Sequence, residues 1–470
     1  MTSPAQQSAS ASTADLAAPH FIGIGGAGMS GLAKILALRG ATVSGSDAKE
    51  SAVVLALKQL GAEVFTGHAA EHVPAGASCI VVSSAIRADN PELVAAVERG
   101  LPVIHRADAL AALMTGRRAL AVAGTHGKTT TTSMLAVSLT GLDLDPSFAI
   151  GGDLDEPGSN AHHGTGEIFV AEADESDRSF QKYSPEVAIV LNVELDHHAN
   201  YASMDEIYES FEAFVARIVP GGTLVLDVDH AGAAELAARV SGRADLTVVR
   251  VGESEAADVR ILRITPRGMT SEVTVRIDGA ELTFTVSVPG RHYAHNAVAA
   301  LAAGAAMGVP AAELARALGG YQGVRRRLQL KGEARGVQVI DSYAHHPTEI
   351  AADLDAITGA AGEGRVLVVF QPHLFSRTQQ LGAEMGEALS RADAVVVLDI
   401  YPAREDPVPG VTSDLVIDSA RRHGTDVVPA HSLAEVPGLI AGMAKDGDLV
   451  LTMGAGDVTS LGPEILAHLA

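Results

Sequence analysis

The sequence predicts an α/β protein of three domains, each built around a mainly parallel sheet. Apolar segments of strand length alternate with segments of helix length through almost the whole chain, which is typical of parallel α/β architecture. A length of 470 residues suggests about three domains, on a soft prior of ~150 residues each. The alternation is interrupted around residues 110–118 and at residues 322–327, and we place the domain boundaries there.

The first domain is expected over residues 19–116. It follows a Ser/Ala/Thr-rich stretch, residues 1–18, whose composition predicts a disordered tail. A helix is expected over residues 30–38 and should end at Gly40. Short apolar strands and a glycine turn before the helix predict a Rossmann-like domain. The expected strands are residues 20–24, 41–45, 80–83 and 102–104.

The second domain is expected over residues 117–325. An alanine-rich helix is predicted at residues 294–307 and should end at Gly308. Three segments with alternating apolar residues predict a small antiparallel flap beside a parallel sheet: residues 259–264, 270–277 and 282–288. The expected buried strands are residues 118–123, 168–172, 187–192 and 223–227.

The third domain is expected over residues 326–470. Strands alternate with helices here as well, so we predict a second Rossmann-like unit. The expected strands are residues 337–340, 366–370, 394–398 and 449–453.

Composition excludes several classes of protein. Apolar runs fall short of the ~20 residues that span a bilayer, and a net charge of -23 argues against nucleic-acid binding. The single cysteine, Cys79, excludes an internal disulfide framework and fits a reducing cytoplasm. Its neighbours Ile80, Val81 and Val82 predict a buried strand, so we interpret Cys79 as a small core residue.

A glycine-framed loop at residues 121–132 predicts a site for a nucleoside triphosphate. Gly124 and Gly127 allow the backbone to curl, Lys128 supplies a cation, and Thr129 supplies a hydroxyl suited to Mg²⁺ where a helix begins. Standard spacing would place glycine at Val122, so the loop is a variant. The alternative is an ordinary strand–turn–helix with a surface lysine.

A second glycine loop, Gly23-Ile-Gly-Gly-Ala-Gly28, follows the first strand. Its spacing suits close approach of a diphosphate, and Asp47, 19 residues beyond Gly28, is a candidate to bind a ribose. The alternative is a glycine turn required only for packing. Alone, this loop indicates an NAD-dependent oxidoreductase, but that class has no use for Lys128. An enzyme that joins a nucleotide-linked substrate to another molecule at the expense of ATP needs both loops.

The residues resemble the Mur ligases, which build the peptide of bacterial cell-wall precursors. The phosphate loop, Gly-Thr-His-Gly-Lys-Thr-Thr-Thr at residues 124–131, is similar to the ATP loop of that family. The resemblance covers nearly the whole chain apart from the tail. Further similar blocks are residues 20–33, 83–86, 90–92, 172–177, 341–349, 370–373 and 454–457.

The resemblance implies that L-alanine is joined to UDP-N-acetylmuramate, with ATP and Mg²⁺, through an acyl phosphate. Such an enzyme would serve peptidoglycan synthesis, cell shape and cell division in the cytoplasm, as a monomer or homodimer. A related ligase that attaches a recycled peptide to the same sugar remains an alternative. The glycine-loop sequence Gly28-Met-Ser-Gly31 favours the alanine-adding enzyme.

The resemblance also assigns residues to the three substrates. The implied metal residues are Thr129, Glu172 and His197, and the residues expected to carry the reaction are Lys128, Glu172, His197, Arg327 and Asp341. The implied ATP contacts are Gly124, Thr125, His126, Gly127, Lys128, Thr129, Thr130, Asn296, Arg327, Asp341, Tyr343 and His345. The implied UDP-sugar contacts are Gly23, Gly25, Gly26, Gly28, Met29, Ser30, Asp47, Ser84, Arg106 and His126. His346, His373 and Arg377 would face the amino acid or the phosphate.

Structural alternatives accompany three of these assignments. The acidic segment at residues 172–177 could be a solvated loop, Asn296 could be a helix cap, and residues 325–327 could be a solvated charge run. The chain departs from the family pattern at Ala199, Tyr293 and Ser342. We expect the third domain to close over the two binding loops by rotation near residues 322–327.

Overall fold

The structure is a computed structural model that describes residues 15–154, 159–196, 200–403 and 405–470. Most of the expected disordered tail, together with His197 and Ala199, therefore lies outside the described residues. The last residues of the expected tail contact residues that flank strands of the first sheet. The Ala18 amide donates to Ser78 Oγ over 3.0 Å, and the Ala17 carbonyl accepts from the Thr42 amide over 2.8 Å. None of the helices in the described residues combines the length and apolarity needed to cross a bilayer.

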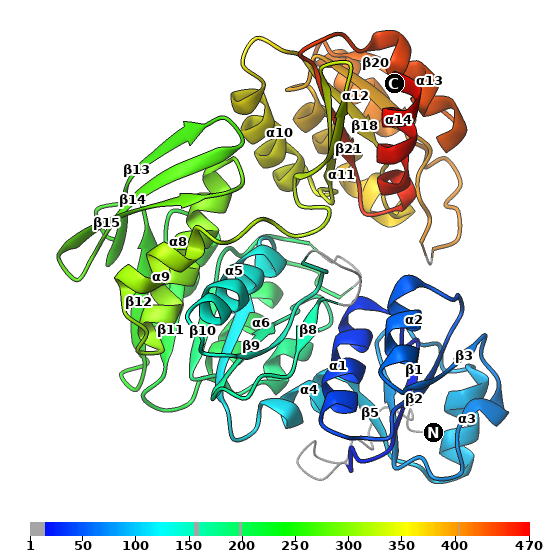
Figure 1. The fold of residues 1–470 in the computed structure, drawn as a ribbon, viewed down its shortest axis with the longest axis vertical. Coiled ribbons are helices and arrows are strands. Elements are labelled where there is room, and N and C mark those ends of the chain that lie inside the picture. Colours follow the sequence, from blue (N-terminus) through cyan, green and yellow to red (C-terminus); the bar gives the residue numbers. More distant parts are fainter. Residues whose placement is uncertain (1–14, 155–158, 197–199, 404) are drawn as a thin grey trace. The chain divides into compact units, whose positions relative to one another are not determined.

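The first sheet has the strand order β3-β2-β1-β4-β5, and all four pairings are parallel (Figure 1). The connections reverse direction at β1, which is where open α/β sheets bind ligands. This order confirms the Rossmann-like prediction. The strands are β1 (Pro19–Ile22), β2 (Ser44–Asp47), β3 (Glu63–Thr66), β4 (Cys79–Val82) and β5 (Val103–His105). The helices are α1 (Ala27–Leu38), α2 (Ala52–Gln59), α3 (Pro91–Glu98) and α4 (Arg106–Met114).

The central sheet has the order β15-β14-β13-β12-β11-β10-β6-β9-β7-β8. β6 lies between β10 and β9, pairs with both in parallel, and leads into the phosphate loop. The three segments expected as a flap belong to this sheet, since β13 pairs in parallel with β12. The first strands are β6 (Arg118–Ala123), β7 (Ser147–Ala149), β8 (Ala161–His162), β9 (Ile168–Glu172) and β10 (Val187–Val190). The others are β11 (Thr223–Asp227), β12 (Thr247–Gly252), β13 (Val259–Arg267), β14 (Thr270–Ile277) and β15 (Ala280–Val286). The helices are α5 (Lys128–Gly141), α6 (Met204–Val215), α7 (Ala231–Arg239), α8 (Arg291–Ala306) and α9 (Ala311–Leu318).

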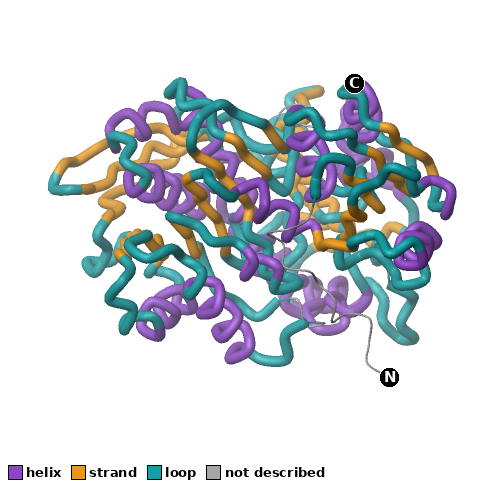
Figure 2. Tube along the Cα trace, turned by 90° about the horizontal axis from the view of Figure 1, so that it is seen from below, coloured by secondary structure: helices purple, strands orange, loops and turns teal. Residues whose placement is uncertain are grey.

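The C-terminal sheet has the order β16-β17-β21-β18-β19-β20, and only its edge strand β16 runs antiparallel to its neighbour. Figure 2 shows helices and strands throughout the trace, and in this domain they alternate from β17 to α14, as the sequence predicted. The strands are β16 (Gln329–Ala334), β17 (Val337–Ser342), β18 (Val366–Phe370), β19 (Ala394–Leu398), β20 (Asp426–Ala430) and β21 (Leu449–Met453). The helices are α10 (Pro347–Ala361), α11 (Phe375–Leu389), α12 (Asp414–Arg422), α13 (Val436–Met443) and α14 (Leu461–Leu469).

The chain divides into two compact units, and parts of β13, β14 and β15 of the central sheet belong to the second. The first comprises residues 1–262, 275–282 and 295–321, and the second comprises residues 263–274, 283–294 and 322–470. One apolar core runs through the first and central sheets, which explains why these two domains cluster together; it includes Phe21 and Phe169. The C-terminal sheet has its own core, which includes Val369 and Val450. The domain limits at residues 116/117 and 325/326 stay predictions.

Cys79 begins β4 and is fully buried in the shared core. Burial raises the pKa of its thiol to about 11. A thiol that stays protonated is a poor nucleophile, so the prediction of a packing role is confirmed.

Candidate active site

The first glycine loop joins β1 to α1 and is braced by the neighbouring strand. Asp47 ends β2, and its Oδ2 accepts a hydrogen bond from the Gly25 amide over 2.8 Å. A Cβ atom added at Gly28 would lie 3.3 Å from Arg106 Nη1, so the guanidinium passes directly beside the start of α1. The N-cap of α1, Gly26, carries no side-chain cap. An uncapped helix start beside a guanidinium suits a diphosphate.

Two residues expected at this loop are turned into the protein instead. Met29 and Ser30 are buried in α1, and Ser30 Oγ donates to the Ala27 carbonyl over 3.2 Å. Asn160, from the central domain, donates to Ser30 Oγ over 3.2 Å and to the Ala27 carbonyl over 2.8 Å. Ser30 therefore secures α1 from within, and no sequence motif pointed to Asn160.

The phosphate loop begins later than standard spacing would place it. Val122 still belongs to β6 and is paired with Glu172 of β9. The chain turns at Gly124, with φ +136°, and Gly127 has φ +84°, a left-handed conformation that strongly favours glycine. The Thr125 and His126 amides are bonded to Asn192, at 3.2 and 2.7 Å. The amides that remain for an anion are therefore those of the first turn of α5, whose N-cap Gly127 has no side-chain cap.

Lys128 is enclosed by the loop that it was predicted to serve. Its Nζ donates to the carbonyls of Gly124 and Thr125, at 2.7 and 3.1 Å, and to Glu175 Oε1 at 3.0 Å. Burial opposes the charged form, but the Glu175 carboxylate, with Asp174 and Glu172, outweighs that effect and raises the pKa of Lys128. The alternative of a surface lysine is therefore wrong: the side chain is only 13% exposed, and its ammonium is paired with a carboxylate.

The acidic segment and the start of α5 each supply one oxygen ligand suited to a hard cation. Glu172, at the end of β9, accepts a hydrogen bond from Thr129 Oγ1 over 3.1 Å and another from the Gly151 amide over 2.7 Å. Carboxylate and hydroxyl oxygens are the ligands that Mg²⁺ prefers, so the two residues fit that ion. Glu175, three residues on, is only 2% exposed, and the alternative of a solvated loop is wrong.

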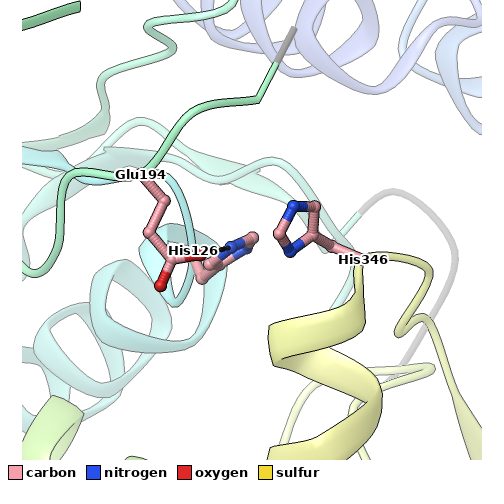
Figure 3. A group of neighbouring side chains, drawn as sticks. All are labelled: His126, Glu194 and His346. Atoms are coloured by element: carbon pink, nitrogen blue, oxygen red, sulfur yellow. Dashed lines mark hydrogen bonds and ion pairs between the residues drawn. The ribbon is translucent and has the colours of Figure 1, made fainter. Parts of the chain in front are cut away.

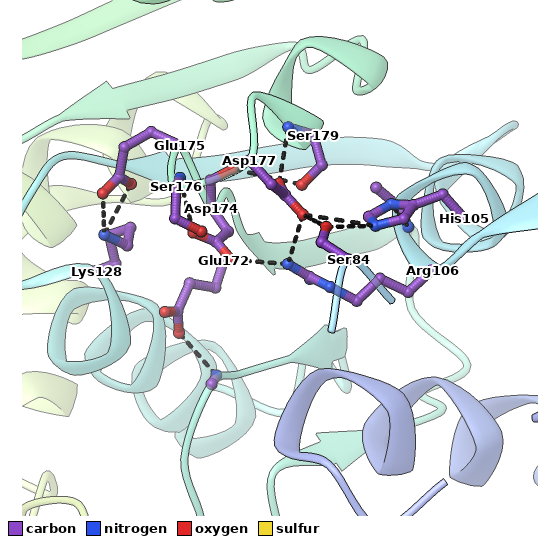
Figure 4. A network of polar contacts seen from close by, with 12 residues as sticks. Ser84, His105, Arg106, Lys128, Glu172, Asp174, Glu175, Ser176, Asp177 and Ser179 are labelled. Atoms are coloured by element: carbon purple, nitrogen blue, oxygen red, sulfur yellow. Dashed lines mark hydrogen bonds and ion pairs between the residues drawn. The ribbon is translucent and has the colours of Figure 1, made fainter. Parts of the chain in front are cut away.

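The same segment reaches the first domain through its other two acids (Figure 4). Asp174 Oδ2 lies 2.7 Å from Arg106 Nη2, and Ser84 Oγ donates to Asp177 Oδ2 over 2.5 Å. Burial would raise the pKa of Asp174, but Arg106 and then Lys128 lower it to about 2. The mutual repulsion of the four acids is thus relieved by cations and hydroxyls of the protein itself.

His126 and Asn296 lie around the phosphate loop. The ring of His126 is paired with Glu194, Nε2 to Oε2 at 3.3 Å (Figure 3), and Glu194 also pairs with His230 at 2.9 Å. A Cβ atom at Gly127 would lie 2.7 Å from Asn296 Oδ1, which places that amide against the loop. Asn296 stands in the second turn of α8, so the alternative of a helix cap is wrong. Glu194 and His230 were missed, because no motif marked them.

In the second unit, several expected residues gather at one edge of the C-terminal sheet. β17 and β18 both run parallel to β21, so their carboxyl ends meet there. His345, which follows β17, packs its ring edge-on against His373, which follows β18, with centroids 5.9 Å apart. Arg327 lies over the Tyr343 ring at 5.0 Å, so the alternative of a purely solvated charge run is wrong for this residue.

The remaining expected residues of this unit are more enclosed. Asp341 is fully buried and accepts hydrogen bonds from Thr452 and Thr459, at 2.8 and 2.5 Å. His346 caps α10 by accepting from the Thr348 amide over 3.4 Å. Arg377 lies in α11 and is 9% exposed. Arg326, which the sequence did not single out, donates to the carbonyls of Gly454 and Gly456. The family-like block at residues 454–457 is the sequence feature that could have indicated this contact.

Two residues that depart from the family pattern, Ser342 and Tyr293, are both buried. Ser342 is buried and donates to Asp353 Oδ2 over 2.5 Å, a contact that an ionised aspartate could not make. Tyr293 is buried at the start of α8, where its ring contacts that of His292 at 4.3 Å.

Three sequence models of one family match the chain in order. They are the Mur ligase family catalytic domain at residues 19–118, the Mur ligase middle domain at residues 122–304, and the Mur ligase glutamate ligase domain at residues 326–456. The chain belongs to the Mur ligase family. The resemblance inferred from the two glycine loops and the acidic segment is thereby confirmed.

Individual Mur ligases match over nearly their whole length. The UDP-N-acetylmuramate–L-alanine ligase of Streptomyces coelicolor is 75% identical, over 96% of this chain and 97% of its own. The enzyme of the same name from Saccharopolyspora erythraea is 54% identical, over 97% and 94%. The crystal structure of UDP-N-acetylmuramate–alanine ligase MurC from Thermotoga maritima has a TM-score of 0.81 at 28% identity, over 96% and 98%. A murein peptide ligase from Psychrobacter arcticus, with a TM-score of 0.71 at 24% identity, shares the fold.

Proposed function

We propose that this chain is an ATP-dependent ligase that joins L-alanine to UDP-N-acetylmuramate, giving UDP-N-acetylmuramoyl-L-alanine, ADP and phosphate. The observation that carries the proposal is the pair of anion-binding loops tied to one acidic segment. Arg106 beside Gly28 is bonded to Asp174, and Lys128 beside Gly127 is bonded to Glu175. The names of the relatives supply the identities of the sugar nucleotide and the amino acid.

The reaction requires activation of a carboxylate, which is a poor acylating agent. A lactyl carboxylate oxygen of the sugar attacks the γ-phosphorus of ATP, and the bond from that phosphorus to the β–γ bridging oxygen breaks, releasing ADP. The amine nitrogen of L-alanine then attacks the acyl carbon of the acyl phosphate. Inorganic phosphate leaves, and the nitrogen loses a proton to give the amide.

The first step brings two anions together, so the protein must neutralise charge. Lys128 and the free amides at the start of α5 bind the β- and γ-phosphates. Thr129 and Glu172 would hold Mg²⁺, with His197 as the further expected ligand, and the ion, when bound, would supply positive charge against the phosphates. Arg327 contributes positive charge at the transferring phosphate, and Asp341 supports this C-terminal part of the site. Asn296, Tyr343 and His345 contact ATP.

The sugar nucleotide occupies the first domain. Its diphosphate lies against the loop from Gly23 to Gly28 and beside Arg106, whose charge is partly balanced by Asp174. Ser84 and His126 are the further expected contacts of the sugar nucleotide. The amino acid is bound by His346, His373 and Arg377 of the C-terminal domain.

The two alternatives explain less of the molecule. An NAD-dependent oxidoreductase has no use for the buried cation Lys128 or for the Thr129–Glu172 oxygen pair. The ligase for a recycled peptide would use the same loops. Its solved relative shares the fold at lower identity than the alanine-adding enzyme of Thermotoga maritima.

ADP release measured with UDP-N-acetylmuramate, ATP and one amino donor at a time tests the proposal. We expect turnover with L-alanine and none with the tripeptide of the recycling reaction. Calorimetry should show binding of UDP-N-acetylmuramate and none of NAD or NADP. Turnover with the tripeptide and not with L-alanine would show that the chain is instead the ligase for a recycled peptide. NAD binding without sugar-nucleotide binding would end the ligase proposal.

A further inference from the structure

We propose that Asp174 and Asp177 are positioning residues of the sugar-nucleotide site: they hold Arg106 and Ser84 toward the diphosphate. This inference rests on the proposed function, because it requires a sugar nucleotide at the first glycine loop. Asp174 and Asp177 belong to the central domain, whereas Arg106 and Ser84 belong to the first domain. An element of the ATP-binding domain would thus determine affinity for the other substrate.

The two terminal nitrogens of the Arg106 guanidinium face different domains. Nη2 is bonded to Asp174 Oδ2 at 2.7 Å and lies 3.7 Å from Asp177 Oδ2. Nη1 lies beside Gly28, 3.3 Å from where a Cβ atom would stand. A guanidinium is planar and rigid, so a carboxylate that fixes one nitrogen also fixes the direction of the other. The contact with Asp174 therefore aims Nη1 at the start of α1.

Asp174 is itself held in place. Its Oδ1 accepts a hydrogen bond from the Ser176 amide at 3.0 Å, so the carboxylate cannot turn freely. Arg106 consequently faces a carboxylate that is held in one orientation.

Asp177 provides a second, parallel contact to the first domain. Its Oδ2 accepts from Ser84 Oγ at 2.5 Å and lies 3.5 Å from His105 Nε2. Ser84 follows β4, and His105 ends β5 and caps α4, the helix that begins with Arg106. The two acids thus fix both the side chain of Arg106 and the start of its helix.

Pre-orienting a long side chain spares a ligand the entropy of ordering it. Removing the carboxylate should therefore weaken binding of the sugar nucleotide more than it slows the chemical step. We expect Asp174→Asn to raise the KM for UDP-N-acetylmuramate about tenfold, the range typical for loss of one charged hydrogen bond. The KM for ATP and kcat should each change less than about threefold.

A double-mutant cycle separates positioning from a general loss of structure. If Asp174 acts through Arg106, Asp174→Asn should have little further effect on sugar-nucleotide binding in an Arg106→Ala background. Additive losses in the cycle would overturn the inference. The matched control is Asp245→Asn, which removes a carboxylate from an exposed arginine pair with Arg243, at 2.8 Å, and should change neither KM.

Asp177→Asn provides an independent route should Asp174→Asn fail to fold, as judged by its thermal unfolding. It should raise the same KM, and its effect should be smaller in a Ser84→Ala background, where only the contacts of Asp177 with His105 and Arg106 remain to be lost. Unchanged sugar-nucleotide KM in folded Asp174→Asn or Asp177→Asn refutes the inference while leaving the ligase proposal intact. Absence of UDP-N-acetylmuramate turnover in the unmodified protein refutes the ligase proposal itself.

Discussion

Lys128 shows how a residue identified from a motif acquires a partner that the motif does not name. The glycine spacing predicted the lysine and its phosphate role. Only the structure shows that its ammonium is paired with Glu175, whose side chain is 3% exposed, and with two loop carbonyls. The consequence is that Lys128 contributes to stability as well as to the proposed chemistry.

Lys128→Ala should lower the rate of ADP formation at least 100-fold, because it removes the cation nearest the proposed phosphate site. It should also destabilise the first unit by about 3 kcal/mol, since it leaves the Glu175 carboxylate buried without its partner. Adding Glu175→Gln should restore most of the stability and none of the activity. Lys58→Ala, which breaks an exposed pair with Glu50, is the control. Near-normal turnover by Lys128→Ala would refute the phosphate-loop assignment.

His295 makes stability depend on pH. Its Nδ1 lies 2.8 Å from Asp227 and its Nε2 lies 3.2 Å from Glu253, while Asp229 contributes charge from the same side. Burial disfavours the charged ring, but Asp227, then Glu253 and Asp229, outweigh it and raise the pKa of His295. A raised folded-state pKa stabilises the fold fully below the unfolded value of ~6.5, and the effect is lost as pH rises through the folded pKa.

The melting temperature of the unmodified protein should therefore exceed that of His295→Gln most at pH 6, and the difference should shrink toward pH 9. His431→Gln, which alters an exposed pair with Asp399, should show no such trend. A difference that is constant from pH 6 to pH 9 would mean that His295 is uncharged in the folded protein.

At the scale of elements, six strands buried on both faces were predicted with their observed limits, and so was the half-exposed strand β14 (Thr270–Ile277), whose apolar residues alternate. The predicted ranges for β6, β9, β11, β18, β19 and β21 coincide with the observed ones, because these interior strands are nearly continuous apolar runs between turns. Short strands and edge strands were not predicted. Examples are β3 (Glu63–Thr66), whose residues are at least partly exposed, and the two-residue β8. An edge strand is determined by its neighbour more than by its own apolar pattern.

The residues of the candidate site also divide into those that a local pattern predicts and those that only the fold reveals. Residues on glycine loops and strand ends could be predicted, since the backbone there has a recognisable pattern. Partners from distant segments could not be predicted, because their contacts leave no local pattern in the sequence. Examples are Asn160, which is bonded to α1, and Asn192, which is bonded to the phosphate loop. Ser30 lies on the predicted motif yet faces the interior, because the motif does not specify which side of α1 is covered.

The strand β9 ends with Glu172, the proposed ligand of Mg²⁺. Glu172→Gln should raise the Mg²⁺ concentration needed for half-maximal ADP release severalfold, because an amide binds a hard cation more weakly than a carboxylate does. Glu167→Gln, just before the same strand and exposed, is the matched control. A Mg²⁺ titration identical to that of the unmodified protein would show that Glu172 only anchors Thr129 and Gly151.

For the whole molecule, the division into two units has a functional consequence. Lys128 belongs to the first unit and Arg327 to the second, and the proposed reaction uses both. We therefore expect UDP-N-acetylmuramate plus a non-hydrolysable ATP analogue to change the distance between the units, through the segment at residues 322–327. X-ray scattering should show a smaller radius of gyration with both ligands than with either alone. Identical curves would remove Arg327 from the proposed mechanism.

The inert Cys79 makes this chain well suited to dye labelling. Its buried thiol, with a pKa of about 11, should not react with maleimides at neutral pH while the protein is folded. Cysteines introduced at Leu55 in the first unit and Leu330 in the second, which are 46% and 53% exposed, would then be the only reactive sites. Energy transfer between two such dyes could follow single molecules through each turnover without removal of a native residue.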